Sequence, residues 1–450
     1  MTPLLYTLGV VLFFGAILAS IGLHELGHMI PAKKFGGKVT QYFIGFGPTV
    51  WSRRVGETEY GVKAIPLGGF VKIVGMLPPG AEDLGEVEHD ADGNRVLRVR
   101  KSNTGMFTQL ISDARAAEWE HISPGDDDRL FYKMTWWKKV IVMAGGPVVN
   151  LLIAFFIFFG VFSTYGNLND GRIEPVVSEV LDCVVPYSED GRACTPQDEV
   201  TPAKRAGVEV GDRFVAVNGV AVTGWREVQN QIRGNADGKV SLTVERDGQQ
   251  VTLDTNTTVT ALPISEDPAN EALTDVGFLG VVPTASPQTG GPLYTLDQMG
   301  TMTVDTVKAL GTLPVKVWGV AKAIVGVEER AVDSPVSIVG GGRIAGEATS
   351  TDTLSLTEKS VFLLMLIGGF NFFIGMFNFV PLLPLDGGHI AGALFEAVRR
   401  SIARLRRRPD PGYVDIARLL PVAYVVASAL LVMGVVLIVG DLVVPVQLLS

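Results

Sequence analysis

The sequence predicts a polytopic α-helical membrane protein with four transmembrane helices and a compact α+β domain outside the membrane. Hydrophobic residues make up 47% of its 450 residues and charged residues only 19%, a composition typical of membrane proteins. Four separate apolar stretches each reach the roughly 20 residues that a spanning helix needs. Between the second and the third of them, short runs of alternating apolar and polar residues indicate β-strands. The net charge of −9 offers no basic surface to nucleic acid, which we do not expect as a partner.

The four predicted spans contain no charged residue. The apolar stretches could instead be buried core helices of a large soluble protein. We disfavour this interpretation because four such stretches occur in one chain. The spans are predicted at 4–23, 140–162, 361–385 and 419–439.

Lysine and arginine near the span ends predict the orientation, because cytoplasmic flanks carry more of them. The flanks 31–50, 120–139 and 389–418 contain fourteen of these residues, whereas the opposite flanks contain three. We therefore expect both termini and the long segment 166–360 outside the cytoplasm. No signal or transit peptide is recognised at the N-terminus, which favours a bacterial plasma membrane.

The stretch IGLHELGHM at the end of the first span carries the first candidate site residues, His24, Glu25 and His28. Histidines four residues apart share one face of a helix. Two imidazoles so placed can bind one Zn²⁺, and Glu25 is then positioned to take a proton from a water at the metal. An ionisable cluster at the end of a transmembrane helix is costly unless it has a function or partners, so we prefer this interpretation to a structural cluster.

A second patch, NFVPLLPLDGGH, ends the third span and offers a further ligand. A catalytic zinc ion needs three protein ligands and one open position. Asp386 is expected at the same membrane depth as the two histidines, and its carboxylate balances part of the charge. His389 is the competing ligand, which we disfavour because it lies beyond the Gly387-Gly388 turn. Asn378 can donate to a developing oxyanion or to the substrate backbone, or else form a helix-packing hydrogen bond.

HELGH at the end of a first span, paired with N-x-x-P and DG at the end of a later one, resembles the site-2 protease family of intramembrane zinc metalloproteases. The closer likeness is to the bacterial branch typified by RseP, the regulator of sigma-E protease. GFGP (45–48) and IPLGGFVKIVGM (65–76) resemble the membrane-re-entrant β element of that family, and AGGPVVN (144–150) its second-helix signature. The resemblance implies that His24, His28 and Asp386 are zinc ligands, that Glu25 is the general base and that Asn378 stabilises the tetrahedral intermediate.

The resemblance also implies regulated proteolysis within the bilayer, near its cytoplasmic face. The expected substrates are single-pass transmembrane proteins, with anti-sigma factors as the first guess. Alternation over 58–65 predicts a strand, and we hypothesise that segment 38–75 clamps the unwound substrate by β-augmentation. A non-proteolytic PDZ-bearing scaffold with a structural metal and a metal-dependent transporter are the alternatives.

The outer segment 166–290 looks like a PDZ domain, on the strength of the run PAKRAGVEVGDRFVAVNGVAV (202–222). Asp247-Gly248 between two alternating runs predicts a hairpin. Such a domain would bind an extended peptide or C-terminus, or would act only as a steric gate. It contains an insertion with Cys183 and Cys194, for which we hypothesise a disulfide, because both lie on the oxidising side.

These inferences divide the chain into nine segments. The segment 291–359 is judged too interrupted for a fifth span. The segments are the first transmembrane helix (1–30), the re-entrant β element (31–77), a cytoplasmic insertion (78–135), the second helix (136–165), the PDZ-like domain (166–290), a membrane-surface linker (291–359), the third helix (360–388), an arginine-rich cytoplasmic loop (389–418) and the fourth helix (419–445).

Overall fold

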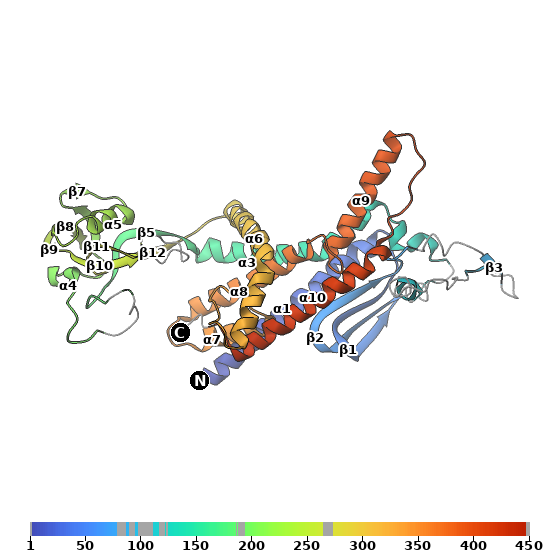
Figure 1. Cartoon of the computed structure of the whole chain (residues 1–450), viewed down its shortest axis with the longest axis horizontal. Coiled ribbons are helices and arrows are strands. Elements are labelled where there is room, and N and C mark those ends of the chain that lie inside the picture. Colours follow the sequence, from blue (N-terminus) through green and yellow to red (C-terminus); the bar gives the residue numbers. More distant parts are fainter. Residues whose placement is uncertain are drawn as a thin grey trace. The chain divides into compact units, whose positions relative to one another are not determined.

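In a computed structural model, the chain forms two compact units (Figure 1). The helical unit consists of Met1–Val161 and Gly291–Ser450, and the sheet unit of Phe162–Gly290. The structure describes residues 2–78, 87–89, 95–97, 111–116, 122, 125–185, 187, 194–263 and 273–446.

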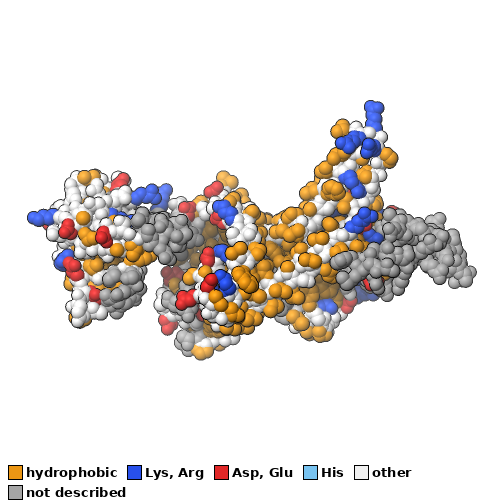
Figure 2. Space-filling model, viewed as in Figure 1, with side chains coloured by type: hydrophobic (Ala, Val, Ile, Leu, Met, Phe, Trp, Pro, Cys, Tyr) orange, Lys and Arg blue, Asp and Glu red, His pale blue; other side chains and the backbone are white. Residues whose placement is uncertain are grey.

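Long helices dominate the helical unit. Four of them are long and apolar enough to cross a membrane, at Pro3–Lys34, Trp136–Thr164, Leu356–Asn378 and Ile416–Val443, and each overlaps one of the four predicted spans. Hydrophobic side chains cover much of the helical face visible in Figure 2, as expected of helices that lie in lipid. The helices are α1 (Thr2–Lys34), α3 (Trp136–Thr164), α6 (Pro292–Ile324), α7 (Ile338–Ser350), α8 (Leu356–Asn378), α9 (Asp386–Leu405) and α10 (Leu420–Val443), which follows the short 3₁₀ turn η4 (Ile416–Leu419).

The segment between the sheet unit and α8 is more regular than the sequence predicted. Helix α6 runs without a break through Pro314, although a proline removes one helical hydrogen bond. Helix α7 packs closely on α1. A Cβ atom on Gly341 of α7 would lie only 2.9 Å from the ring of Phe13 on α1. Its small residues therefore give α7 a face that fits against the first span.

The third predicted span is shorter than expected and is followed by a second helix. Helix α8 ends at Asn378, and α9 begins at Asp386. Gly387 and Gly388, expected as a turn, form the first turn of α9, where the preceding loop packs so closely that neither position has room for a Cβ atom. The arginine-rich segment 389–418, predicted as a loop, is helical as far as Leu405.

Strands β1 (Val39–Val55) and β2 (Thr58–Ile73) form an antiparallel pair that bends into four rows. The first half of β1 pairs with both halves of β2, since Phe43 lies opposite Phe70 and also opposite Gly61. The second half of β1 pairs only with the first half of β2, where Ser52 lies opposite Gly61. The predicted strand at 58–65 is confirmed, but it is an inner row. Residues 69–73 form an outer row, which we call the edge row.

The cytoplasmic insertion predicted at 78–135 is described only in part. It contains β3 (Val87–His89), paired with β4 (Arg95–Leu97), and one helical turn at 111–116. Two 3₁₀ turns, η1 (Asp127–Arg129) and η2 (Phe131–Lys133), lead into α3. Phe131 in η2 is buried in the core that includes Met29 of α1.

The sheet unit is built on one main sheet with the strand order β12-β5-β6-β8-β9, in which β7 pairs with β6. Its core includes Phe214, Leu242 and Val228, the last on α5. Asp247 and Gly248 both have positive φ between β8 and β9, which confirms the predicted hairpin. The elements are β5 (Asn167–Val180), α4 (Pro202–Ala206), β6 (Arg213–Val217), β7 (Val220–Ala221), α5 (Trp225–Arg233), β8 (Lys239–Arg246), β9 (Gln249–Asn256), β12 (Val281–Gln288) and a separate pair, β10 (Thr258–Pro263) with β11 (Leu273–Phe278).

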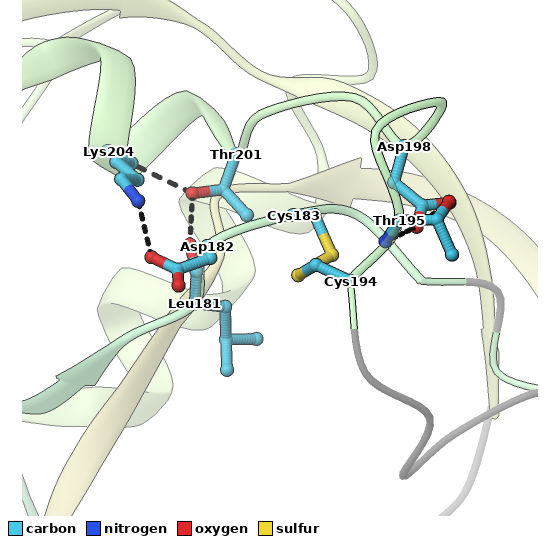
Figure 3. Close-up of a disulfide and its surroundings, with 8 residues drawn as sticks. All are labelled: Leu181, Asp182, Cys183, Cys194, Thr195, Asp198, Thr201 and Lys204. Atoms are coloured by element: carbon cyan, nitrogen blue, oxygen red, sulfur yellow. Dashed lines mark hydrogen bonds and ion pairs between the residues drawn. A yellow bond between two sulfur atoms is a disulfide. The ribbon is translucent and has the colours of Figure 1, made fainter.

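Cys183 and Cys194 form a disulfide, as hypothesised (Figure 3). Beside it, the buried Thr201 hydroxyl donates a hydrogen bond to the Leu181 carbonyl and accepts one from the Lys204 backbone N–H. Thr201 thus caps the N-terminus of α4. The disulfide and this helix cap together fix both ends of the insertion.

Candidate metal centre

The C-terminal half of α1 presents His24 and His28 on one face, one helical turn apart. His28 is buried, and its Nδ1 lies 2.8 Å from the carbonyl oxygen of Val142 on α3. Nδ1–H therefore donates to that carbonyl, and Nε2 is left with its lone pair free to bind a metal. The Nε2 atoms of the two histidines are 3.2 Å apart.

Asp386, at the N-terminus of α9, completes a group of three potential metal ligands. Its Oδ2 lies 3.4 Å from Nε2 of His24 and 3.3 Å from Nε2 of His28. One ligand atom from each of the three residues lies within 4.8 Å of the others. The structure thus brings together residues from α1 and from a helix more than 350 positions later in the chain.

This group fits a zinc ion. Ligand atoms at Zn–N and Zn–O bonds of about 2.0–2.1 Å in a tetrahedron lie about 3.3 Å from one another, close to the three separations in the structure. Two imidazoles and one carboxylate are ligands that zinc commonly takes in enzymes. Three protein ligands also leave one tetrahedral position open, as in catalytic rather than structural sites.

Glycines of the AGGPVVN signature allow α3 to approach the two histidines. A Cβ atom on Gly146 would overlap Nε2 of His28, and one on Gly145 would overlap the Gly27 carbonyl of α1. Side chains at these two positions would push α3 away and separate His28 from its Val142 partner. The signature therefore has a direct structural role in the site.

The ligand group opens into a cavity of about 430 Å³. Glu25 faces this cavity and accepts a hydrogen bond from the backbone N–H of Val71, in the edge row. A Cβ atom on Gly69 would lie 3.1 Å from Cγ of Glu25, so the edge row runs directly beside the carboxylate. The cavity is also lined by Ile21, Gly68, Phe70, Ile73, Met76, Met143, Asn150, Ile374, Asn378, Pro384 and His389.

The predicted residue Asn378 and the disfavoured ligand His389 lie in the wall of the same cavity. Asn378 is the last residue of α8, and its Nδ2 donates to the Ile374 carbonyl at 3.1 Å. His389 is one turn after Asp386 on α9, not beyond a turn as expected, and it lines the cavity outside the three-residue group.

A buried ion pair holds α9 against α3. Lys139 Nζ lies 2.8 Å from Oε2 of Glu396, with side-chain exposures of 7% and 2%. Tyr413 lies over the Lys139 ammonium group, 5.1 Å from ring centroid to Nζ. Helix α9 carries the predicted ligand Asp386, and α3 carries Val142, the hydrogen-bond partner of His28. The Lys139–Glu396 ion pair therefore stabilises the two helices that position these groups.

Sequence reasoning missed the Val142 carbonyl and the role of Asn150, and it expected the clamp in segment 38–75 without singling out the edge row. The Val142 carbonyl and the edge row act through backbone groups, which leave no residue-type signal in the sequence. Asn150 did leave a signal in the sequence. It is a polar residue within an uncharged span, where burying a polar side chain is costly unless the side chain has a function or a partner.

Comparison with known proteins gives a consistent result. The model of peptidase family M50 matches residues 12–414 of the chain. The chain is 34% identical to the zinc metalloprotease Rip1 of Mycobacterium tuberculosis, over 99% of this chain and 100% of that protein. It is 32% identical to Rip1 of Mycolicibacterium smegmatis over the same shares. The zinc metalloprotease RasP of Bacillus licheniformis is 24% identical, over 86% of this chain and 90% of that protein.

Proposed function

The chain belongs to peptidase family M50, the site-2 proteases, and from this premise we propose that His24, His28 and Asp386 hold the zinc ion that serves hydrolysis of transmembrane segments. As a member of this family, it is a zinc metalloprotease of regulated intramembrane proteolysis. The observation that carries the proposed ligand set is the convergence of three ligand atoms at separations of 3.2–3.4 Å. The open fourth position, facing the cavity, favours catalysis over a structural metal.

Glu25 is proposed as the general base. When bound, zinc lowers the pKa of a water and polarises the scissile carbonyl. Glu25 lies between the two histidines in sequence and faces the cavity, so its carboxylate can accept the proton of the attacking water and pass it to the leaving amine. The Val71 N–H orients that carboxylate.

Asn378 is proposed to stabilise the oxyanion. Its amide is bonded to its own helix, at the Ile374 carbonyl, and this bond must be exchanged for one to the substrate. A single oxyanion donor contributes roughly 100- to 1,000-fold to the rate in other hydrolases. Asn378→Ala should therefore slow turnover by about this factor without loss of zinc.

The edge row is proposed as the element that binds unwound substrate. A transmembrane helix hides its peptide bonds, and unwinding frees backbone groups that must be paired in lipid. Residues 69–73 are paired on one side only among the described residues and line the cavity, so they can add an extended substrate strand by β-augmentation. This assigns the clamp of the re-entrant element to 69–73 rather than to the inner row 58–65.

A proline tests the clamp. Because the Val71 N–H also bonds Glu25, the readout is binding of a transmembrane peptide to zinc-loaded Glu25→Gln protein, in which no turnover occurs. Val71→Pro removes one backbone donor of the edge row and should raise the Kd of that peptide about tenfold at unchanged zinc content. Arg53→Pro, in the other outer row of the β1–β2 pair, is the matched control and should have little effect. Equal peptide binding by both variants would refute the clamp.

The sheet unit is proposed to be PDZ-like and to bind an extended peptide. A pocket of about 120 Å³ lies between α5 and the start of β12, lined by Trp225, Gln229, Leu279 and Val281 among others. Strand β12 ends the described sheet, so its outer edge is available for β-augmentation. Gln229→Trp should fill the pocket and abolish peptide binding, whereas Asn230→Trp, on the exposed neighbouring residue, should not. Unaltered substrate handling by both variants would favour a steric gate.

The protein is proposed to lie in the bacterial plasma membrane, with both termini and the sheet unit outside the cytoplasm. The distribution of lysine and arginine supports this orientation. The disulfide in the sheet unit agrees with it, because disulfides persist in oxidising compartments. The proposed substrates are single-pass proteins of that membrane, with anti-sigma factors first. Labelling of single introduced cysteines from each side of the membrane, in a variant without the two native ones, tests the orientation.

Cleavage by purified protein tests the proposed site. Wild-type and Glu25→Gln protein, in detergent, are incubated with fluorescent peptides whose roughly 20 apolar residues are interrupted at the centre by Asn-Gly. We expect the wild type to cleave and Glu25→Gln to retain zinc without cleaving. Zinc loss in Glu25→Gln would make Glu25 a ligand, and full activity would exclude it as the base. If the protein were a scaffold or a transporter, neither the wild type nor Glu25→Gln would cleave the peptide.

A further inference from the structure

Asn150 has a buried acceptor that the fold leaves unused. The residue is 1% exposed, and its Oδ1 has no hydrogen-bond partner among the described residues. Buried side-chain amides are nearly always hydrogen-bonded, because an unpaired one costs stability. An unpaired amide at such a position calls for a partner that binds later.

Asn150 is also on the side of α3 that faces the metal group. Gly146, one turn earlier on the same face, lies so close to His24 and His28 that a Cβ atom would overlap His28 Nε2. Asn150 therefore lies about 6 Å further along the helix from that contact. It lines the same cavity as Glu25 and Asn378.

A second asparagine shows that burial alone does not explain this position. Asn371 on α8 is fully buried, and its Oδ1 also lacks a partner among the described residues. Its Nδ2, however, donates to the Ile367 carbonyl at 2.9 Å, and the residue does not line the cavity. Asn371 is thus placed for helix packing, whereas Asn150 is placed for a ligand of the cavity.

The chemistry of the substrate supplies the missing partner. An unwound strand has backbone N–H and C=O groups along both edges, and all must be paired in an apolar site. The edge row 69–73 can pair with one edge only. A carboxamide carries one acceptor and two donors, which match a peptide unit. We propose that the Asn150 side chain binds the substrate backbone, with Oδ1 accepting from a peptide N–H on the edge that the edge row leaves unpaired.

This inference rests on the proposed function, but it can fail separately from it. The test measures binding of the Asn-Gly peptide described above to zinc-loaded Glu25→Gln protein, in which no turnover occurs. Asn150→Leu, which keeps the side-chain volume and removes the amide, should raise Kd about tenfold. It should keep one zinc per chain and should not lower the unfolding temperature, because it also removes an unpaired buried polar group. Asn371→Leu is the matched control and should leave Kd unchanged.

Two results would overturn the proposal. A Kd within about twofold of the parent would show that Asn150 does not bind the backbone, and loss of zinc would show that it supports the metal instead. Asn150→Ser, whose hydroxyl can bond within the helix, replaces the leucine variant if that one does not fold, with the same expected change in Kd. Failure of the proposed function would appear elsewhere, as absence of cleavage by the wild type.

Discussion

The helical unit and the sheet unit bury polar groups in different ways. In the sheet unit, the carboxylate of Asp212 is 1% exposed, but it accepts hydrogen bonds from Arg246 and from the Glu209 backbone N–H. Among the described residues, every buried side-chain N or O atom without a hydrogen-bond partner belongs to the helical unit, including atoms of His24 and Asn150. The sheet unit has none among its described residues. Among the residues with such atoms, His24, Asn150 and His389 line the cavity of the metal group, so in the helical unit part of the buried polarity is placed for a ligand.

Removal of a proposed ligand should have the largest effect and should be confined to the helical unit. Asp386→Ala leaves two imidazoles, so we expect zinc below detection by elemental analysis. The loss of affinity should exceed the roughly 100-fold that removal of an outer-shell partner costs. Cleavage should fall with zinc, while the sheet unit keeps its disulfide and its own unfolding transition. Glu358→Gln, at the exposed start of α8, is the control. Full zinc content in Asp386→Ala would contradict the assignment.

Breaking the buried pair between α3 and α9 should have the next largest effect. Glu396→Ala leaves the Lys139 ammonium group buried without its carboxylate, which should cost about 3–5 kcal/mol in thermal unfolding. The double variant Lys139→Met with Glu396→Leu should recover most of that loss. In the sheet unit, the exposed pair of Lys204 and Asp182 should contribute under about 1 kcal/mol, as Asp182→Ala would measure. Equal losses for both pairs would remove the contrast between the units.

Loss of the disulfide should affect only the sheet unit. Replacing Cys183 and Cys194 by serine frees a short loop and should destabilise this unit by about 2–4 kcal/mol. Zinc content should not change. The measurement is thermal unfolding of the full chain with and without reductant, and reductant should have no effect on the double variant. A fall in zinc content would show that the units are coupled.

The smallest effect should appear in the pH dependence of the sheet unit. Burial raises the pKa of Asp212, but the hydrogen bonds from Arg246 and from the Glu209 backbone N–H, together with the charge of Arg246, outweigh burial and hold the pKa below its ordinary value. The ionised carboxylate therefore stabilises the folded state above the unfolded pKa of about 3.9, and this stabilisation is lost as pH falls through the lowered folded pKa. Asp212→Asn should cost about 2 kcal/mol at neutral pH and flatten the acid limb of the stability curve. An unchanged acid limb would show that Asp212 is not responsible.

The sequence predicted the membrane spans and the three converging residues because both depend on simple physical rules. Spans need only length and apolarity, and HELGH needs only helical spacing. Asp386 followed from the orientation rule, which put the ends of the first and third spans at one depth.

The remaining features depend on contacts that the sequence does not encode locally. Helix α6 is continuous through Pro314 because one lost hydrogen bond does not end a 33-residue helix. Gly387 and Gly388 read as a turn, but they lie in the first turn of α9, and glycine is needed there because the preceding loop leaves no room for a Cβ atom. The predicted strand 58–65 is an inner row and residues 69–73 are an outer row, because the first half of β1 pairs with both halves of β2. The alternation of apolar and polar residues predicts a strand but does not show which strands pair.

X-ray absorption spectroscopy of purified zinc-loaded protein tests the central claim most directly. We predict a single zinc with two imidazole nitrogens and oxygen ligands, unchanged in His389→Ala and altered or absent in Asp386→Asn. A spectrum with three imidazoles that loses one in His389→Ala would contradict the account, as would a spectrum unaffected by Asp386→Asn.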